Sequence, residues 1–93
     1  MSAEVLGSAA EAIRSDHGPE PDMFFAAVAD LLDSEANAWE FDYNRYEDRH
    51  LFAYGRNPSP EFRAHIATIS REYADGQHRP SLAVARAYLG ESA

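Results

Sequence analysis

The sequence predicts an all-α protein, and two observations lead to this prediction. No stretch of more than a few residues alternates apolar and polar side chains as a half-buried β-strand would. Helical periodicity and helix-terminal residues recur along the chain instead. Because 93 residues leave room for one core, we predict a single helical domain over residues 1–93. We expect a four-helix irregular bundle built on one long second helix, with completion by dimerisation as an alternative.

The first helix is expected to start after Ser2, which suits an N-cap, and to end at about Arg14. The segment 16–21 carries one glycine and two prolines, which favour a turned or extended path. Asp22 then suits the N-cap of the second helix. The apolar stripe expected on the first helix consists of Val5, Ala9, Ala12 and Ile13.

The second helix is predicted to be unusually long, because its apolar period holds the same phase from Met23 to about Phe52. Thirty helical residues span about 45 Å, more than a compact chain of this size can cover. Two alternatives follow: the helix breaks within 33–37, with Ser34 or Asn37 as a new N-cap, or it continues and a second subunit covers the excess. We favour a continuous helix. The residues expected on its inward stripe are Phe24, Phe25, Val28, Leu32, Ala36, Trp39, Tyr43, Tyr46 and His50.

The sequence predicts a loop and two shorter helices after residue 53. Glycine, asparagine and proline mark residues 54–60 as a loop, in which Ser59 suits the N-cap of the third helix. Gly76 is expected to end that helix, Pro80 to open the fourth, and Gly90 to close it. The inward residues expected are Phe62, Ile66, Ile69 and Tyr73 on the third helix, and Leu82, Ala85 and Leu89 on the fourth.

Composition excludes several classes of protein. The absence of Cys removes disulfides, thiolate metal sites and cysteine nucleophiles. The longest apolar run, residues 23–29, is far shorter than a membrane span, and no secretory signal is recognisable, so we expect a cytoplasmic protein without membrane contact. Every basic residue is Arg and none is Lys, which suggests a GC-rich bacterium or its phage.

The charge of the chain is concentrated in its first half. Residues 1–42 hold ten acidic residues and one Arg, a net charge of −9, whereas residues 43–93 hold six acidic residues and seven Arg, a net charge of +1. Such a field repels nucleic acid, so we expect no direct binding of DNA or RNA. Three roles of the acidic half are open. It could serve solubility alone, it could steer a basic partner, or it could dock on the Arg-bearing half of another copy.

Aromatic residues of the second helix exceed what its inward stripe can hold. Phe41 and Phe52 fall together almost opposite Trp39 on a helical wheel, flanked by Arg45 and Asp48. Either the first and third helices sandwich this segment from both sides, or an apolar patch remains exposed as an interface.

One pattern points weakly to metal. Glu47 and His50 have the Glu-x-x-His spacing of carboxylate-bridged di-iron bundles, but the pattern occurs once. Glu61 with His65 is the other close pair, and Glu35 could complete a site only if packing or a dimer brings distant turns together. We therefore predict no metal and no cofactor.

These observations favour a small, acidic, non-enzymatic accessory protein that binds a basic surface of another protein, as inhibitors, immunity proteins and regulators do. No nucleophile elbow or phosphate-binding glycine loop is present, so no catalytic residue is proposed. The alternatives are a metal-binding helical oligomer with Glu and His ligands, or a structural homodimer without a further ligand. The residues predicted to bind the partner are Asp30, Asp33, Glu40, Phe41, Asp42, Arg45, Asp48 and Phe52.

Overall fold

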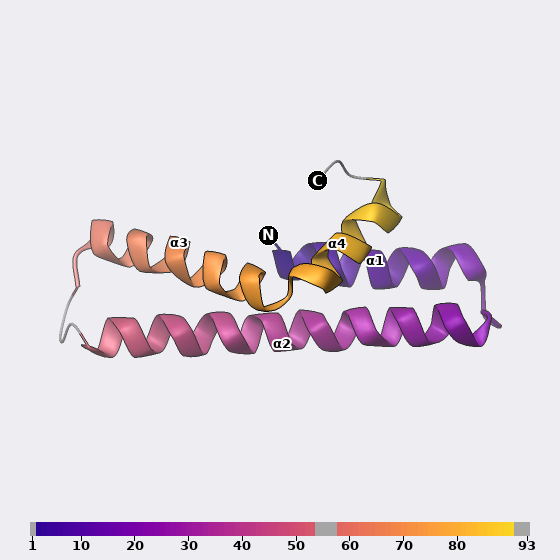
Figure 1. Cartoon of the computed structure of the whole chain (residues 1–93), viewed down its shortest axis with the longest axis horizontal. Coiled ribbons are helices and arrows are strands. Elements are labelled where there is room, and N and C mark those ends of the chain that lie inside the picture. The colour runs from indigo at the N-terminus through magenta and orange to yellow at the C-terminus, as the bar shows by residue number, and fades with distance from the viewer. Residues whose placement is uncertain (1, 54–57, 91–93) are drawn as a thin grey trace.

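A computed structural model describes residues 2–53 and 58–90, which form four helices and no strand (Figure 1). This confirms the predicted all-α irregular bundle on a long second helix. None of the described helices is long and apolar enough to cross a membrane. The predicted loop 54–60 lies partly outside the described residues. The helices are α1 (Ser2–His17), α2 (Met23–Ala53), α3 (Pro60–Gln77) and α4 (Arg79–Leu89).

The segment between α1 and α2 forms the predicted turn with Asp22 as the N-cap of α2, although α1 ends later than predicted. It continues about one turn past Arg14 to His17, whose ring stacks on Phe25 with 3.8 Å between ring centroids. Gly18 then adopts a φ of 71°, a left-handed conformation that glycine accepts without steric cost. The Asp22 carboxylate accepts the backbone N–H of Phe24 at 2.9 Å, as an N-cap does.

The second helix is continuous, as we favoured, and the alternative of a break within 33–37 is wrong. Ser34 and Asn37 lie inside α2 and cap nothing. α1 packs along the first half of α2 and α3 along its second half, both on the same side (Figure 1). The chain itself therefore covers the length of α2 on that side, and the molecule measures 51 × 23 × 18 Å.

The connection between α3 and α4 is shorter than predicted, because α3 is capped two residues later, at His78, and α4 begins one residue before Pro80. Ser59 caps α3 by accepting the backbone N–H of Phe62 at 3.1 Å. Gly76, predicted to end α3, lies inside it, and His78 is the single residue between the two helices. α4 ends as predicted at Gly90, with a φ of 74°.

The core lies along the side of α2 that α1 and α3 cover. Trp39 is its largest member and is only 1% exposed. The predicted stripe of α1 missed Leu6, which is fully buried, and the stripe of α2 wrongly included Phe24, which is 67% exposed. Fully buried alanines line the contacts and let the helix backbones approach closely: Ala9, Ala10, Ala29, Ala74 and Ala85.

Candidate functional site

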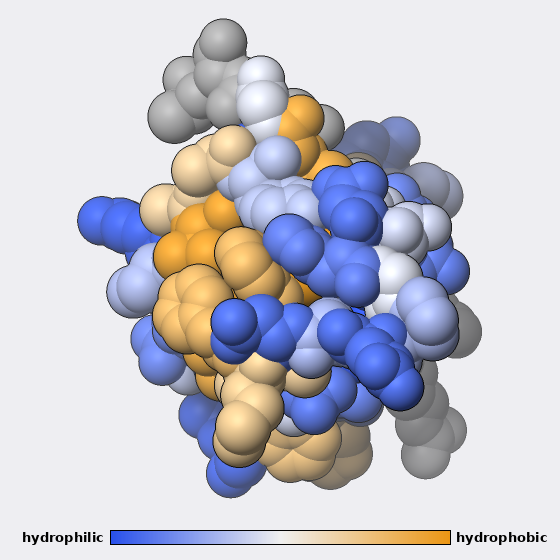
Figure 2. All heavy atoms as spheres, turned by 90° about the vertical axis from the view of Figure 1, so that its right-hand side faces the viewer, coloured by the Kyte–Doolittle hydropathy of each residue, from blue (hydrophilic) through white to orange (hydrophobic). Residues whose placement is uncertain are grey.

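The side of α2 that faces away from α1 and α3 carries large exposed apolar side chains. We call it the outward face of α2; Phe41 and Phe52 lie on it, exposed by 62% and 88%, and Leu31 and Phe24 lie toward its edge, exposed by 55% and 67%. The expectation that the first and third helices sandwich this segment is therefore wrong, because both pack on the other side. Seen from the end where α2 begins, hydrophobic residues form a band through the middle-left of the surface, with hydrophilic residues on both flanks (Figure 2).

Two of the acids predicted to bind a partner form ion pairs within the chain. Arg14 of α1 reaches across to α2, where its guanidinium donates to Asp33 at 2.6 Å and to Asp30 at 2.9 Å. These pairs join the end of α1 to the first half of α2. They also neutralise part of the charge that the sequence placed on the predicted binding surface.

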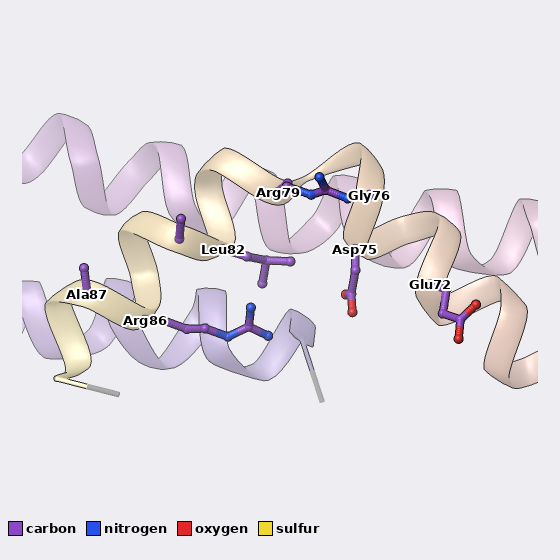
Figure 3. Close-up of a pocket in the computed structure, with 8 residues that line it drawn as sticks. Glu72, Asp75, Gly76, Arg79, Leu82, Arg86 and Ala87 are labelled. Atoms are coloured by element: carbon purple, nitrogen blue, oxygen red, sulfur yellow. The ribbon is translucent and has the colours of Figure 1, made fainter. Parts of the chain in front are cut away.

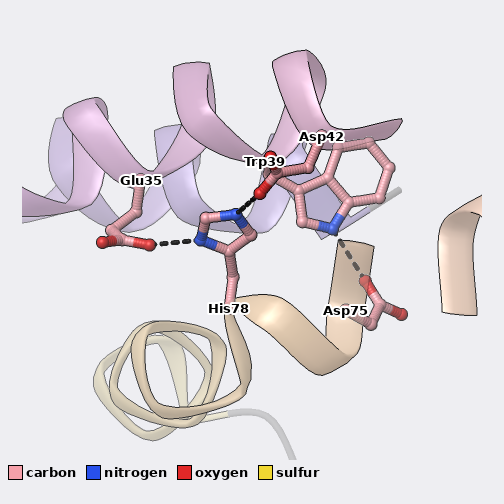
Figure 4. A network of polar contacts seen from close by, with 5 residues as sticks. All are labelled: Glu35, Trp39, Asp42, Asp75 and His78. Atoms are coloured by element: carbon pink, nitrogen blue, oxygen red, sulfur yellow. Dashed lines mark hydrogen bonds and ion pairs between the residues drawn. The ribbon is translucent and has the colours of Figure 1, made fainter. Parts of the chain in front are cut away.

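A third predicted binding residue, Asp42, belongs to a polar cluster around His78 (Figure 4). The imidazole of His78 lies between two carboxylates of α2: Nδ1 contacts Glu35, and Nε2 contacts the Oδ2 of Asp42 at 2.7 Å. A neutral imidazole has one donor nitrogen, whereas an imidazolium has two, so this geometry favours the protonated ring. His78 is 8% exposed.

The electrostatics of the cluster agree with a protonated ring. Burial lowers the pKa of His78, but hydrogen bonds to Glu35 and Asp42 outweigh burial, and the pKa of His78 is raised above its ordinary value of 6.5. A charged histidine thus ties the junction between α3 and α4 to the middle of α2. The sequence did not predict this role, because His78 fell in a short connection without any motif.

Trp39 lies next to this cluster and makes a second link between α2 and α3. Its indole Nε1 donates to the Oδ1 of Asp75 at 2.9 Å (Figure 4). Glu35, Trp39 and Asp42 occur at helical spacing on one side of α2, which is why all three meet the end of α3. The polar groups of the junction thereby have partners, as burial requires.

The remaining predicted binding residues stay available on the surface. Glu40, Arg45 and Asp48 are exposed, and none of them forms an ion pair within residues 2–53 and 58–90. Phe41 and Phe52 are exposed on the same helix. The structure therefore divides the predicted site into two groups. Asp30, Asp33 and Asp42 form ion pairs within the chain, and the other five residues are exposed without an ion pair among the described residues.

Both side chains of the Glu-x-x-His pattern, Glu47 and His50, contact other residues of α2. Glu47 accepts the hydroxyl of Tyr43 at 2.9 Å. His50 stacks on Tyr46 at 4.1 Å between ring centroids, and its Nδ1 lies 2.8 Å from the carbonyl oxygen of Tyr46. Across the part of the chain that is described, no group of three or more His, Asp or Glu side chains is arranged so that it could hold a metal ion.

A pocket of about 570 Å³ lies in the angle between α3 and α4 (Figure 3). Glu72 and Asp75 line it from α3, and Arg79 and Arg86 from α4, with Leu82 at its base. These two arginines form no ion pair with any acid among the described residues, although two carboxylates line the same space. The sequence analysis missed this pocket, because the angle between the two helices creates it.

Comparison with known proteins adds no assignment to this geometry. The chain matches no family model, and neither a curated protein nor a solved structure matches it. Function has to be inferred from the outward face of α2, the His78 cluster and the charged pocket themselves.

Proposed function

We propose that this chain is a non-enzymatic protein whose role is to bind another protein through the outward face of α2. One observation carries the proposal: Phe41 and Phe52 are 62% and 88% exposed on a long helix whose outward face no described element covers. Exposing large apolar side chains to water costs free energy that a partner recovers on binding. Exposed aromatic residues are also the common anchors of protein interfaces.

Charge supports a basic surface on that partner. The chain carries a net charge of −8, and Glu40 and Asp48 are exposed on α2; Arg45, exposed between Phe41 and Phe52 in the sequence, offsets part of this local charge. This field would steer a basic protein toward the outward face, after which the aromatic residues would supply affinity. Inhibitors, immunity proteins and regulators of basic proteins act in this way.

The proposal can be tested by a pull-down from the source cell at low salt with the tagged chain and its double variant Phe41→Ala/Phe52→Ala. We expect the double variant to lose the partner while its melting temperature stays close to that of the wild type, because both side chains are exposed. Val84→Ala is the matched control, since Val84 is an apolar residue 52% exposed on α4. Mass spectrometry would identify the protein retained by wild type and control.

Two results would contradict the proposal. If the double variant and Val84→Ala retain the same proteins equally, the outward face is not the binding surface. If the affinity of the identified partner does not weaken as salt rises, electrostatic steering is wrong, because salt screens exposed charges.

A structural homodimer is the second candidate, and the spacing of the outward face favours it. One row of mainly apolar residues recurs every seven positions, a spacing typical of helices that pair along their length. Native mass spectrometry distinguishes the candidates: a dimer that Phe41→Ala/Phe52→Ala converts to monomer supports self-association, and a monomeric wild type contradicts it. The row consists of Phe24, Leu31, Ala38 and Phe52 and is interrupted by Arg45.

A further inference from the structure

The pocket between α3 and α4 contains charged groups of both signs. Asp75 and Arg86 are half-buried, whereas Glu72 and Arg79 are exposed. Charges that are partly removed from water lose hydration, and this loss is normally offset by pairing with an opposite charge. Neither arginine of the pocket has such a pair in the described chain. An unpaired, half-buried guanidinium is thus available for an anionic group of a ligand.

Asp75 offers the complementary negative charge. One of its oxygens, Oδ1, accepts the indole N–H of Trp39 at 2.9 Å. The same carboxylate lines the pocket, and an ionised carboxylate can accept several hydrogen bonds through its two oxygens. The Trp39 bond thus fixes the orientation of the Asp75 carboxylate and leaves it capacity for a cationic group.

The two half-buried charges face a shared space with an apolar residue between them. In Figure 3 the Leu82 side chain projects between the guanidinium of Arg86 and the carboxylate of Asp75. Leu82 is 2% exposed and forms the apolar base of the pocket. A volume of about 570 Å³ lies within the range of small-molecule sites. The matching ligand has an anionic end, a cationic end and a short apolar body that joins them.

We propose that this pocket binds a compact zwitterion, with its carboxylate at Arg86, its ammonium group at Asp75 and its apolar body on Leu82. Short peptides with free ends and ω-amino acids share this chemistry. The proposal is independent of partner binding by α2, since every residue that would touch the ligand belongs to α3 or α4 and none lies on the outward face of α2.

Trp39 gives this site a direct optical signal. It is the only Trp of the chain, and its indole donates to the carboxylate that would receive the ammonium group. A cation that arrives at Asp75 changes the field at the indole, so ligand binding should shift the fluorescence of Trp39 in a saturable manner. Isothermal titration calorimetry would confirm the stoichiometry independently.

The test titrates the full chain with four probes. 6-Aminohexanoate carries both charges, whereas hexanoate and hexylamine each lack one of them on the same carbon chain; trialanine represents a short peptide. We expect saturable binding of 6-aminohexanoate or trialanine, and binding of hexanoate and hexylamine that is at least about tenfold weaker, because a hydrogen bond to a charged group is lost. The tighter of the two zwitterions identifies the ligand class.

Two variants and one control locate the binding site. Arg86→Gln removes the positive charge, and Asp75→Asn removes the negative charge while its amide oxygen can still accept the Trp39 N–H. Each should weaken binding of the zwitterion by about tenfold or more. Arg63→Gln is the matched control, because Arg63 is exposed on α3 and does not line the pocket. Circular dichroism of each variant verifies that it is folded.

The proposal is overturned if neither zwitterion gives a saturable signal by fluorescence and calorimetry. It is overturned equally if hexanoate or hexylamine binds as tightly as the better zwitterion, since the site would then recognise one charge only. Binding that survives both Arg86→Gln and Asp75→Asn would place the ligand elsewhere. None of these outcomes affects the pull-down that tests the outward face of α2.

Discussion

His78 shows how one residue can set the position of a whole helix pair. It is the only residue between α3 and α4, and its ring lies between the carboxylates of Glu35 and Asp42. Because both carboxylates belong to α2, the two contacts fix where the α3–α4 junction docks. The imidazolium is buried, so the cluster depends on the protonation of this ring.

The stability of the protein should therefore depend on pH through His78. A group whose pKa is higher in the folded state than in the unfolded state stabilises the fold fully below its unfolded pKa, here about 6.5, and loses this contribution as pH rises through the folded pKa. We expect His78→Gln to lower the free energy of unfolding more at pH 6 than at pH 9. Chemical denaturation of both proteins at the two pH values measures this difference.

His65→Gln is the control for that prediction. His65 is exposed on α3 and makes no ion pair in the part of the chain that is described. Its substitution should leave the pH dependence of stability unchanged. An equal loss of stability for His78→Gln at pH 6 and pH 9 would contradict the role of a charged His78.

At the scale of the helices, proline and glycine decide where each one stops. α2 contains neither residue, which allows an uninterrupted helix over Met23–Ala53. α3 cannot continue into α4, because the ring of Pro80 would clash with the carbonyl of Gly76 and has no N–H to donate to it. The break therefore falls at His78, and Gly76 remains helical.

The two glycines near these helix ends should respond to alanine in opposite ways. A Cβ added at Gly76 meets nothing within 4 Å, so Gly76→Ala should stabilise the protein by about 0.5–1 kcal/mol through higher helix propensity. Gly90 has a φ of 74°, so Gly90→Ala should cost roughly 1 kcal/mol. Thermal unfolding of both variants tests this. Destabilisation by Gly76→Ala would indicate that Gly76 ends α3 after all.

At the scale of the whole molecule, the shape follows from two helices placed one after the other along α2. α1 and α3 share the same side of α2 instead of packing around it (Figure 1). This arrangement produces a radius of gyration of 15.9 Å, above the roughly 13 Å of a compact chain of similar length. The same arrangement leaves the outward face of α2 bare.

Small-angle X-ray scattering should detect this shape. We expect the monomer to have a radius of gyration near 15.9 Å plus a small contribution from the hydration shell, and a longest dimension of at least 51 Å. A homodimer paired along the outward face would double the mass while its longest dimension changed little. A monomer with a radius of gyration near 13 Å would contradict the extended arrangement of α1 and α3.

Features that depend on neighbours along the chain could be predicted from the amino-acid order. The all-α class, the continuity of α2 and the caps at Asp22, Ser59 and Gly90 were predicted correctly, because periodicity and capping act within a few residues. The helical wheel also placed Phe41 and Phe52 together opposite Trp39, but helix packing decided that they are exposed and not sandwiched.

The pairing of charges and the position of the pocket depend on how the helices pack against one another. His78 meets residues 43 and 36 positions away in the sequence, and Arg14 meets residues 19 and 16 positions away. Helix packing sets such distances, and no local pattern encodes them. Several acidic residues of the first half therefore form ion pairs within the chain: Asp30, Asp33, Glu35 and Asp42. The charge left for a partner is smaller than the sequence suggested.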